Sequence, residues 1–483
     1  MIPGFNFLSV SFILFLGTAI PVAIMIILEK RSPFKTAAWI LALILLPIIG
    51  VVFYLFFGQE FRKRKLFSRK GIRSLNTFRK LSFRQLRQFD KTLKKPENKL
   101  NGQSNIIRLL LNNSNALLTT GNRLEILNNA IETFPALFDA IEKAKHHIHL
   151  EYYIIDNDKT GNQLKTLLIK KSRQGIQVRV IIDDVGSWGL PERYISQLRK
   201  NGVEIYSFME VRFPRLTSRV NFRNHRKILI VDGKVGFTGG INIADRYLEG
   251  VKKVGPWHDL HLKMEGDAVA CLQVVFAADW YFVTRKNLTG IKYFPPLSEE
   301  PGIPVQISAS GPDSDWESIS QAFFAAIANA KNRVCLVTPY LMPPPQIIAA
   351  LKTASLSNVD VRIIIPEKSD SIIPRWSSFS YVEELLEAGI KIYFFQKGFI
   401  HSKYLLVDEN FASIGTTNLD FRSLETNFEV NAFIFDESFN ARLHKQFKAD
   451  LRKSRAIRLK EWKQRHWHFK LRESLAHIIS PML

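Results

Sequence analysis

Two stretches of this 483-residue chain share one pattern. Residues 224–233 read NHRKILIVDG, and the chain continues to GGIN at residues 239–242. Residues 400–408 read IHSKYLLVD, and GTTN follows at residues 415–418. Counted from each histidine, a lysine stands at +2, an aspartate at +7, a glycine at +14 and an asparagine at +17 in both stretches. One such spacing is a weak signal, but two copies indicate a duplicated site.

The spacing of this duplicated pattern suits a phosphodiester-binding site. Residues i and i+2 of a strand point to one face, so His225 and Lys227 are predicted to enter one site, as are His401 and Lys403. Two ammonium groups neutralise charge on the non-bridging oxygens. Two imidazoles can stand on opposite sides of phosphorus for an in-line displacement. We therefore expect these four residues to be catalytic.

The remaining members of the pattern have supporting roles. Asp232 and Asp408 complete the two motifs at the ends of the predicted strands, beside turns. They are expected to brace the backbone rather than to transfer protons. Asn242 and Asn418 offer neutral amide donors, which predicts that they bind the substrate phosphate.

A carboxylate follows each copy of the pattern. Residues 257–262 read WHDLHL and residues 427–432 read NFEVNA, so Asp259 and Glu429 correspond. A carboxylate on the neighbouring strand can accept the Nδ1 proton of an imidazole and leave Nε2 facing phosphorus. We expect Asp259 to orient His225, and Glu429 to stabilise the cationic form of His401. The alternative is that both are ordinary acids at strand ends.

The duplication extends beyond the catalytic pattern. ALFDAI at residues 136–141 matches AFFAAI at 322–327, and VRVII at 178–182 matches VRIII at 361–365. Amphipathic helices alternate with short β-branched runs, which predicts an α/β fold in each half. We place the first half at residues 106–298 and the second at 299–451. A pseudo-twofold axis is expected to relate them, with a cleft between.

Two long uncharged runs precede the duplicated region. Residues 5–28 and 36–57 are each long enough to span a bilayer, and only the short loop 29–35 separates them. A cleaved signal peptide is the alternative for the first run, but that run lacks a basic start and a second span follows it. Residues 1–60 are therefore predicted to form a transmembrane helical hairpin.

The net charge of +23 is concentrated in two segments. Residues 61–95 carry +13 and residues 452–472 carry +8, which leaves +2 for the rest of the chain. We interpret residues 61–105 as a basic juxtamembrane segment and 452–483 as a basic amphipathic tail. Both fit an anionic membrane surface, although solvated charge or nucleic acid are alternatives. The excess of lysine and arginine after the second span predicts that the large C-terminal part is cytoplasmic. The two lysines and one arginine of the loop 29–35 argue mildly against this.

Composition and the other histidines exclude several classes of protein. An apolar fraction of 46% rules out a chain that is disordered overall, and two cysteines cannot form a disulfide framework or a four-thiolate zinc site. His146, His147 and His149 have no equivalents in the second half, which argues against a metal cluster. Within the tail, Trp462, His466 and Phe469 recur at helical spacing and fit either a core-packed or an interfacial helix.

The chain resembles the bacterial cardiolipin synthases of the phospholipase D superfamily. The resemblance covers residues 1–483. It is carried by the two runs, both motifs, and the segments PFKTAAWI at 33–40, YYI at 152–154, RNHRK at 223–227, SGPDS at 310–314 and SPML at 480–483. It implies two phospholipase D-like α/β sandwich halves behind a membrane hairpin in the bacterial cytoplasmic membrane.

The resemblance also implies a reaction. One phosphatidylglycerol transfers its phosphatidyl group to another, which gives cardiolipin and glycerol through a phosphohistidine and without metal or other cofactor. It favours His225 as nucleophile and His401 as acid and base, and its partners would be membrane phospholipids rather than nucleic acid. A membrane-tethered nuclease, another phosphatidyltransferase or phospholipase, and a non-catalytic lipid-binding anchor remain alternatives.

Overall fold

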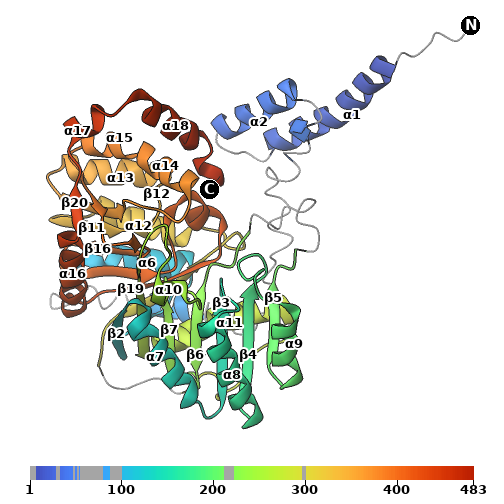
Figure 1. Ribbon diagram of the computed structural model, residues 1–483, viewed down its shortest axis with the longest axis vertical. Coiled ribbons are helices and arrows are strands. Elements are labelled where there is room, and N and C mark those ends of the chain that lie inside the picture. Colours follow the sequence, from blue (N-terminus) through green and yellow to red (C-terminus); the bar gives the residue numbers. More distant parts are fainter. Residues whose placement is uncertain are drawn as a thin grey trace, which may run out of the picture. The chain divides into compact units, whose positions relative to one another are not determined.

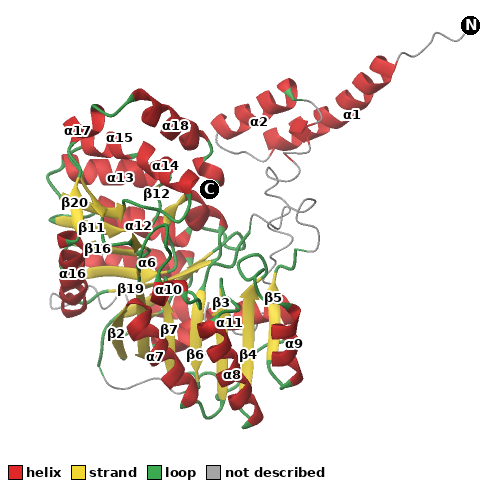
Figure 2. Ribbon diagram, viewed as in Figure 1, coloured by secondary structure: helices red, strands yellow, loops and turns green. Residues whose placement is uncertain are grey.

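The computed structural model describes residues 7–28, 33–46, 49–51, 54, 80–86, 101–211, 222–295 and 301–483. The chain divides into two compact units. One consists of Met1–Ser68 with Val211–Phe222, and the other of Arg69–Glu210 with Arg223–Leu483. Both copies of the duplicated pattern belong to this large unit, whose helices and strands are coloured by type in Figure 2.

The small unit contains two described helices, α1 (Phe7–Leu28) and α2 (Pro33–Leu45). Ile26 of α1 and Leu43 of α2 form an apolar cluster with Tyr54, which lies outside both helices. Among the residues that the structure describes, no helix has the length and apolar character that a membrane crossing requires. The predicted hairpin is therefore not confirmed. Most of the predicted second span after residue 51, and most of the basic run 61–95, lie outside the described residues.

The first half of the large unit is a seven-stranded sheet in the order β2-β9-β7-β6-β3-β4-β5. β3, β4 and β5 are parallel, and the other pairs are antiparallel. Every residue of β6 is buried, because α7 and α11 both pack against it. The elements are β2 (Asn122–Asn128), α7 (Asn129–Glu142), β3 (His147–Tyr152), α8 (Lys159–Arg173), β4 (Gln177–Asp183), α9 (Glu192–Lys200), β5 (Glu204–Phe208), β6 (Lys227–Val231), β7 (Val235–Gly239), α10 (Arg246–Glu249), β8 (Trp257–His258), β9 (Leu260–Gly266) and α11 (Ala268–Thr284).

The second half repeats this strand order as β10-β19-β17-β16-β11-β13-β14 within a nine-stranded sheet. The repeat seen in the sequence is thus a repeat of topology, and the α/β prediction is confirmed. The elements are β10 (Val305–Ser310), α12 (Ser318–Ala328), β11 (Arg333–Val337), β12 (Leu341–Met342), α13 (Pro345–Leu356), β13 (Asp360–Pro366), α14 (Ile372–Ser380), α15 (Val382–Glu387), β14 (Lys391–Phe395), β15 (Phe399–Ile400), β16 (Tyr404–Val407), β17 (Phe411–Gly415), β18 (Leu419–Asp420), a π-helix (Arg422–Thr426), β19 (Glu429–Ile434) and α16 (Glu437–Arg452).

The chain segment before the first half packs on the second half. A 3-10 turn (Asn101–Gln103) leads into α6 (Ser104–Asn113), and β1 (Leu118–Thr119) pairs with β10. Leu110 of α6 shares an apolar cluster with Ile319 and Phe323 of α12. Residues 106–119 therefore belong to the second half's layers, although their place in the sequence assigned them to the first half. Apolar burial rather than chain order decides this boundary.

The C-terminal tail is part of the second half and not a free extension. β20 (Ser454–Ala456) pairs with β14, and α17 (Leu459–Lys463), α18 (Trp467–Ile478) and a 3-10 turn (Ser480–Met482) follow. Trp462 lies in the core, with its ring 5.7 Å from Phe379 and 5.6 Å from Phe394. Phe469 is 40% exposed. The core-packed alternative thus holds for Trp462 but not for Phe469. In Figure 1, α18 lies on the outer side of α14 in the second half.

Candidate active site

Two short parallel backbone contacts join the halves where the duplicated patterns begin. Asn224 bridges Phe428, and Ile400 of β15 pairs with His258 of β8. In each contact, one partner is followed by a motif histidine and the other by a carboxylate. These pairs are His225 with Glu429 and His401 with Asp259. Backbone hydrogen bonds fix this register: the His225 N–H donates to the Phe428 carbonyl at 3.0 Å, and the His401 N–H to the His258 carbonyl at 2.7 Å.

Each motif histidine is paired with a carboxylate from the opposite half. The Nδ1 atom of His225 lies 2.9 Å from Oε1 and 3.0 Å from Oε2 of Glu429. The Nδ1 atom of His401 lies 2.6 Å from Oδ2 of Asp259. The pairing expected from the sequence, Asp259 with His225 and Glu429 with His401, is therefore wrong. The two bridges between the halves carry each histidine to the other half's carboxylate.

Burial dominates the electrostatics of both imidazoles. It lowers the pKa of His225 to about 4 and that of His401 to about 4, against the attraction of their carboxylates. Burial alone would raise the pKa of each carboxylate. At Asp259 the charges of Lys403 and His401 outweigh burial, and at Glu429 those of His225 and Lys227 do, so both pKa values lie below normal. The resting site thus holds neutral imidazoles against ionised carboxylates at neutral pH.

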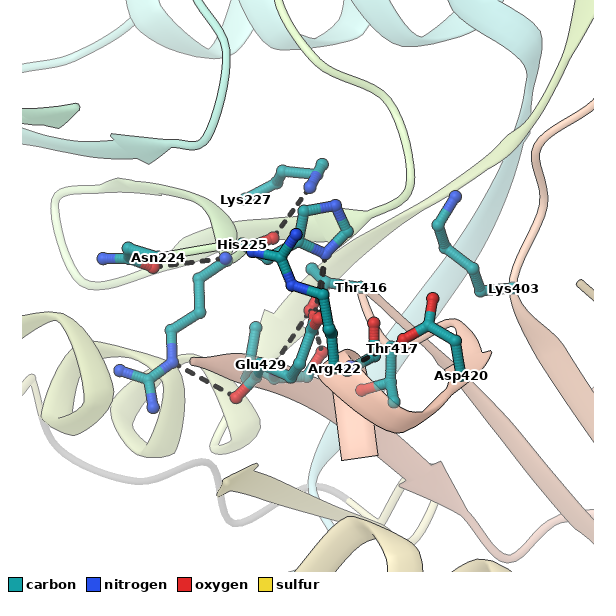
Figure 3. A network of polar contacts seen from close by, with 12 residues as sticks. Asn224, His225, Lys227, Lys403, Thr416, Thr417, Asp420, Arg422 and Glu429 are labelled. Atoms are coloured by element: carbon teal, nitrogen blue, oxygen red, sulfur yellow. Dashed lines mark hydrogen bonds and ion pairs between the residues drawn. The ribbon is translucent and has the colours of Figure 1, made fainter. Parts of the chain in front are cut away.

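The two motif lysines stand in the same site. Lys227 Nζ donates to the His225 carbonyl at 2.7 Å, and Lys403 Nζ lies 3.9 Å from Oδ2 of Asp259 and 2.9 Å from Nδ1 of His401. Burial lowers the pKa of Lys227 to about 7 and that of Lys403 to about 8, and the Lys403 charge further lowers the pKa of Lys227. In Figure 3 both lysine side chains end on the side of the His225 ring opposite Glu429. An anion placed there would meet two ammonium groups.

The two asparagines are placed differently. Asn242 donates from Nδ2 to the Tyr247 hydroxyl at 2.8 Å and accepts from the Ile154 N–H at 3.2 Å. Asn418 is buried, and among the described residues its Oδ1 has no hydrogen-bond partner. Asn242 is thus engaged by the protein, and Asn418 is the freer of the two. Their role in substrate binding stays a prediction.

Asp232 and Asp408 brace the backbone, as expected from their place at the turns. Asp232 accepts from the N–H groups of residues 145, 146 and 147 at 2.7–2.9 Å. Asp408 accepts from residues 331, 332 and 333 at 2.7–3.2 Å. Both have positive φ, 55° and 49°, so each ends its strand in the left-handed region. Each clamps the start of the neighbouring strand in its own half.

Several residues that support the site were missed from the sequence. Arg226 is fully buried, forms an ion pair with Asp279, and donates from Nε to the Glu429 carbonyl at 3.2 Å. Thr416 donates its hydroxyl to the Glu429 carboxylate. The signal for Asp279 was present, because FAAD at 276–279 matches FKAD at 447–450. Arg226 gave no such signal, since its counterpart in the second motif is Ser402.

A second repeated signal was an arginine 21 residues after each histidine, Arg246 and Arg422. Arg246 pairs with Asp156. The Arg422 charge acts to lower the pKa of Tyr153, although burial raises it overall, and the Tyr153 ring lies 5.0 Å from that of His225. Figure 3 shows Arg422 beside the His225 and Glu429 pair. Of these two arginines, Arg422 thus lies beside the candidate site, whereas Arg246 pairs with Asp156.

No group of three or more possible ligands is placed to hold a metal ion within the described ranges. His146 is exposed, whereas His147 and His149 are buried, with ring centroids 5.0 and 5.4 Å from that of Tyr293. The arrangement that remains at the junction is two neutral imidazoles with Nδ1 held, two lysines and ionised carboxylates behind them. Such a set can form a covalent bond from one Nε2 and move a proton at the other.

Comparisons with known proteins identify relatives over most of the chain. A family model described as "Cardiolipin synthase, PLD-like domain" matches residues 137–280 and 323–451, one motif in each. A second, "Phospholipase D-nuclease N-terminal", matches residues 18–59. The cardiolipin synthase of Geobacillus sp. (strain WCH70) is 42% identical over 465 residues, 96% of this chain and 91% of that protein. That of Alkalihalophilus pseudofirmus is 42% identical over 480 residues, 99% of this chain and 94% of its own.

A solved structure shares the fold. The phosphatidylserine synthase of Haemophilus influenzae Rd KW20 superposes with a TM-score of 0.61 at 14% identity, over 80% of this chain and 100% of that one. At that identity the likeness concerns the fold alone. It extends over both halves of the repeat.

Proposed function

The chain belongs to the cardiolipin synthase family of phospholipase D-like phosphatidyltransferases, and from this premise we propose its substrates and mechanism. One phosphatidylglycerol donates its phosphatidyl group to a second, and the products are cardiolipin and glycerol. The observation that carries the proposal is the reciprocal pairing of His225 with Glu429 and His401 with Asp259, beside two lysines.

In the first half-reaction, Nε2 of His225 attacks phosphorus. The N–P bond forms as the bond from phosphorus to the glycerol oxygen breaks, and His401 gives that oxygen its proton. Lys227 and Lys403 neutralise the non-bridging oxygens. Because entry of a phosphodiester anion favours cationic neighbours, it raises the pKa values that burial had lowered, which supports a protonated His401 in the substrate complex.

In the second half-reaction, the glycerol hydroxyl of another phosphatidylglycerol attacks the phosphohistidine. His401 accepts the hydroxyl proton, the new P–O bond forms and the N–P bond breaks, which returns both histidines to their starting state. Water in place of the acceptor would give phosphatidic acid instead of cardiolipin.

We assign the role of nucleophile to His225 and that of acid and base to His401, the order that the resemblance of the two motifs favours. Burial lowers the pKa of both histidines to about 4, and the charge of Lys403 acts to lower both. The Asp370 carboxylate acts to raise the pKa of His401, which supports this order. Glu429 would then stabilise the positive charge that phosphorylation places on the His225 ring.

We also propose where the reaction takes place. Residues 5–28 and 36–57 form a hairpin in the bacterial cytoplasmic membrane, with the large unit on the cytoplasmic side. The proposal is supported by the length of both uncharged runs and by the dense lysine and arginine cluster that follows the second.

The test is lipid product analysis with the full-length protein in phosphatidylglycerol vesicles, with and without a chelator. Wild-type protein is expected to form cardiolipin and glycerol in equal amounts in both conditions. His225→Ala and His401→Ala are expected to lose more than about 99% of the activity, and exposed His146→Ala serves as the matched control. Phosphatidic acid as the main product, or cleavage of DNA in place of lipid, would contradict the proposal.

A further inference from the structure

Helix α18 turns its apolar residues outward. Trp467 is 71% exposed, Leu471 49%, Leu475 58% and Ile478 73%. At about 100° per residue, these four side chains fall within an arc of about 80°, which we call the outer stripe. An ordinary surface helix buries such a stripe against the core. A contiguous exposed apolar stripe indicates a surface that another phase or molecule covers.

The outward orientation of the stripe is built into the fold. On the opposite side of α18, Glu473 is buried and accepts two hydrogen bonds from Arg465, at 2.6 and 2.8 Å. The Arg465 guanidinium in turn lies over the Trp462 ring at 3.3 Å from its centroid, and Trp462 belongs to the core. Rotating the helix to bury the outer stripe would expose this ion pair and break it. The stripe is therefore held outward by specific contacts.

The charges around the stripe favour an anionic neighbour. Glu473 is the single acid of α18, and it faces inward. Lys470, which also pairs with Glu383 at 3.6 Å, and Arg472 flank the stripe, and Arg472 lies over the Phe469 ring at 4.3 Å. An apolar stripe edged by cations, with an exposed tryptophan at its start, is the pattern of a helix that lies in the headgroup layer of anionic lipid.

The stripe is structurally continuous with the candidate active site. α18 packs on α14, which begins two residues after Asp370 and exposes Ile372 and Ile373 by 50% and 45%. α14 also packs against β12, which pairs with β18 directly after Asn418. Figure 1 shows α18, α14 and β12 in one region of the second half.

We propose that α18 is a docking helix that seats the large unit on an anionic lipid surface through its outer stripe. The proposal rests on the proposed function, because the substrates of that function are membrane lipids. Lys470 and Arg472 would lie at the headgroups, and Trp467 at the boundary with the acyl chains. Docking would bring phosphodiesters to imidazoles that are only 8% and 6% exposed.

Fluorescence of a probe on α18 tests the docking without measuring catalysis. Leu475→Cys in full-length His225→Ala protein is labelled with an environment-sensitive dye, since Cys271 and Cys335 are buried. Leu356→Cys, at a position 71% exposed on α13, is the matched control. In nanodiscs containing phosphatidylserine, bromine-labelled acyl chains are expected to quench the probe at residue 475 at least twofold more than the probe at 356.

Three results would overturn the proposal. Quenching of the residue 475 probe by aqueous iodide, but not by brominated lipid, would place the stripe in water. Protection from both quenchers would mean that protein, either a second copy or another segment of this chain, covers it. Equal quenching in nanodiscs of phosphatidylcholine alone would contradict the role of anionic lipid.

A kinetic comparison separates docking from chemistry. The variant Leu471→Gln/Leu475→Gln/Ile478→Gln is expected to lose at least fivefold more activity on phosphatidylglycerol vesicles than on a monomeric short-chain nitrophenyl phosphodiester. Leu356→Gln is the control. Equal losses on both substrates would count against docking. If the wild-type protein formed no cardiolipin from phosphatidylglycerol vesicles, that result would count against the proposed function instead.

Discussion

Nδ1 of His401 lies 2.6 Å from Oδ2 of Asp259, a carboxylate that belongs to the opposite half of the repeat. The same exchange occurs in reverse between His225 and Glu429. Neither half of the duplicated region therefore contains a complete histidine and carboxylate pair. The junction of the halves is itself the site, and any change that separates them removes both pairs at once.

The two histidines are expected to differ in their response to the leaving group. Nitrophenolate leaves without a proton, so His401→Ala should still form the covalent intermediate from a nitrophenyl phosphodiester, with a burst of nitrophenol. His225→Ala should show no burst, because the nucleophile is absent. Rapid quenching in alkaline detergent and mapping of the labelled peptide check the assignment. A burst in His225→Ala but not in His401→Ala would exchange the two roles.

Each carboxylate variant is expected to show the same kind of kinetic defect as a variant of the histidine that it contacts in the other half. Asp259→Asn weakens the acid His401, so it should slow transfer from phosphatidylglycerol by about 10²-fold or more but affect the nitrophenyl substrate little. Glu429→Gln should slow both substrates, because it removes the charge behind His225. Burst kinetics on the two substrates measure this. The reverse pattern would indicate pairing within each half, and thermal unfolding of each variant controls for misfolding.

The activity is expected to fall at a lower pH than the titration of ordinary, exposed lysines would cause. Burial lowers the pKa of Lys227 to about 7 and of Lys403 to about 8, whereas the pKa of an exposed lysine is about 10.4. The charged ammonium binds the phosphate and exists below the pKa, so kcat/KM should decline as the pH rises through 7 to 8. Burst rates across pH on the nitrophenyl phosphodiester, whose leaving group needs no proton from His401, check this. A flat profile to about pH 9.5 would contradict it.

Asp232→Asn is expected to destabilise the protein more than it changes the site. Burial alone would raise the pKa of Asp232, but three backbone N–H donors outweigh burial and hold the pKa below normal. Its stabilisation is thus fully present above about pH 4 and lost as pH falls through the lowered pKa. The loss should be about 2–4 kcal/mol of unfolding free energy at pH 7. Denaturant titration measures it, and Asp139→Asn, which removes an exposed acid paired with Lys143, should cost less than about 0.5 kcal/mol.

Cysteine accessibility checks the proposed topology. A cysteine at Leu356, which is exposed on α13, should be shielded from impermeant thiol reagents in intact cells and labelled after permeabilisation. A cysteine at Gly71, outside the described residues, should behave in the same way. Labelling of either in intact cells would place the large unit on the outer side.

The fold, and the residues that form the site, could be predicted from the sequence. The duplicated spacing around His225 and His401 requires only that strands alternate their side chains and that turns follow, and both are local properties of the chain. Asp232 and Asp408 could be read as braces for the same reason. Matching helices and strands in the same order then predicted two α/β halves.

The tertiary structure alone decided which groups act together. The register of Asn224 against Phe428 and of Ile400 against His258 is set by how the halves pack, and no pattern within one half encodes it. For that reason the pairing of histidines and carboxylates was predicted wrongly although all four residues were found. The same holds for α6, placed by apolar burial on the distant half, and for α18. The apolar spacing along α18 is typical of a face that packs on the core, but the buried Arg465–Glu473 pair lies on the opposite side of the helix and holds the apolar face outward.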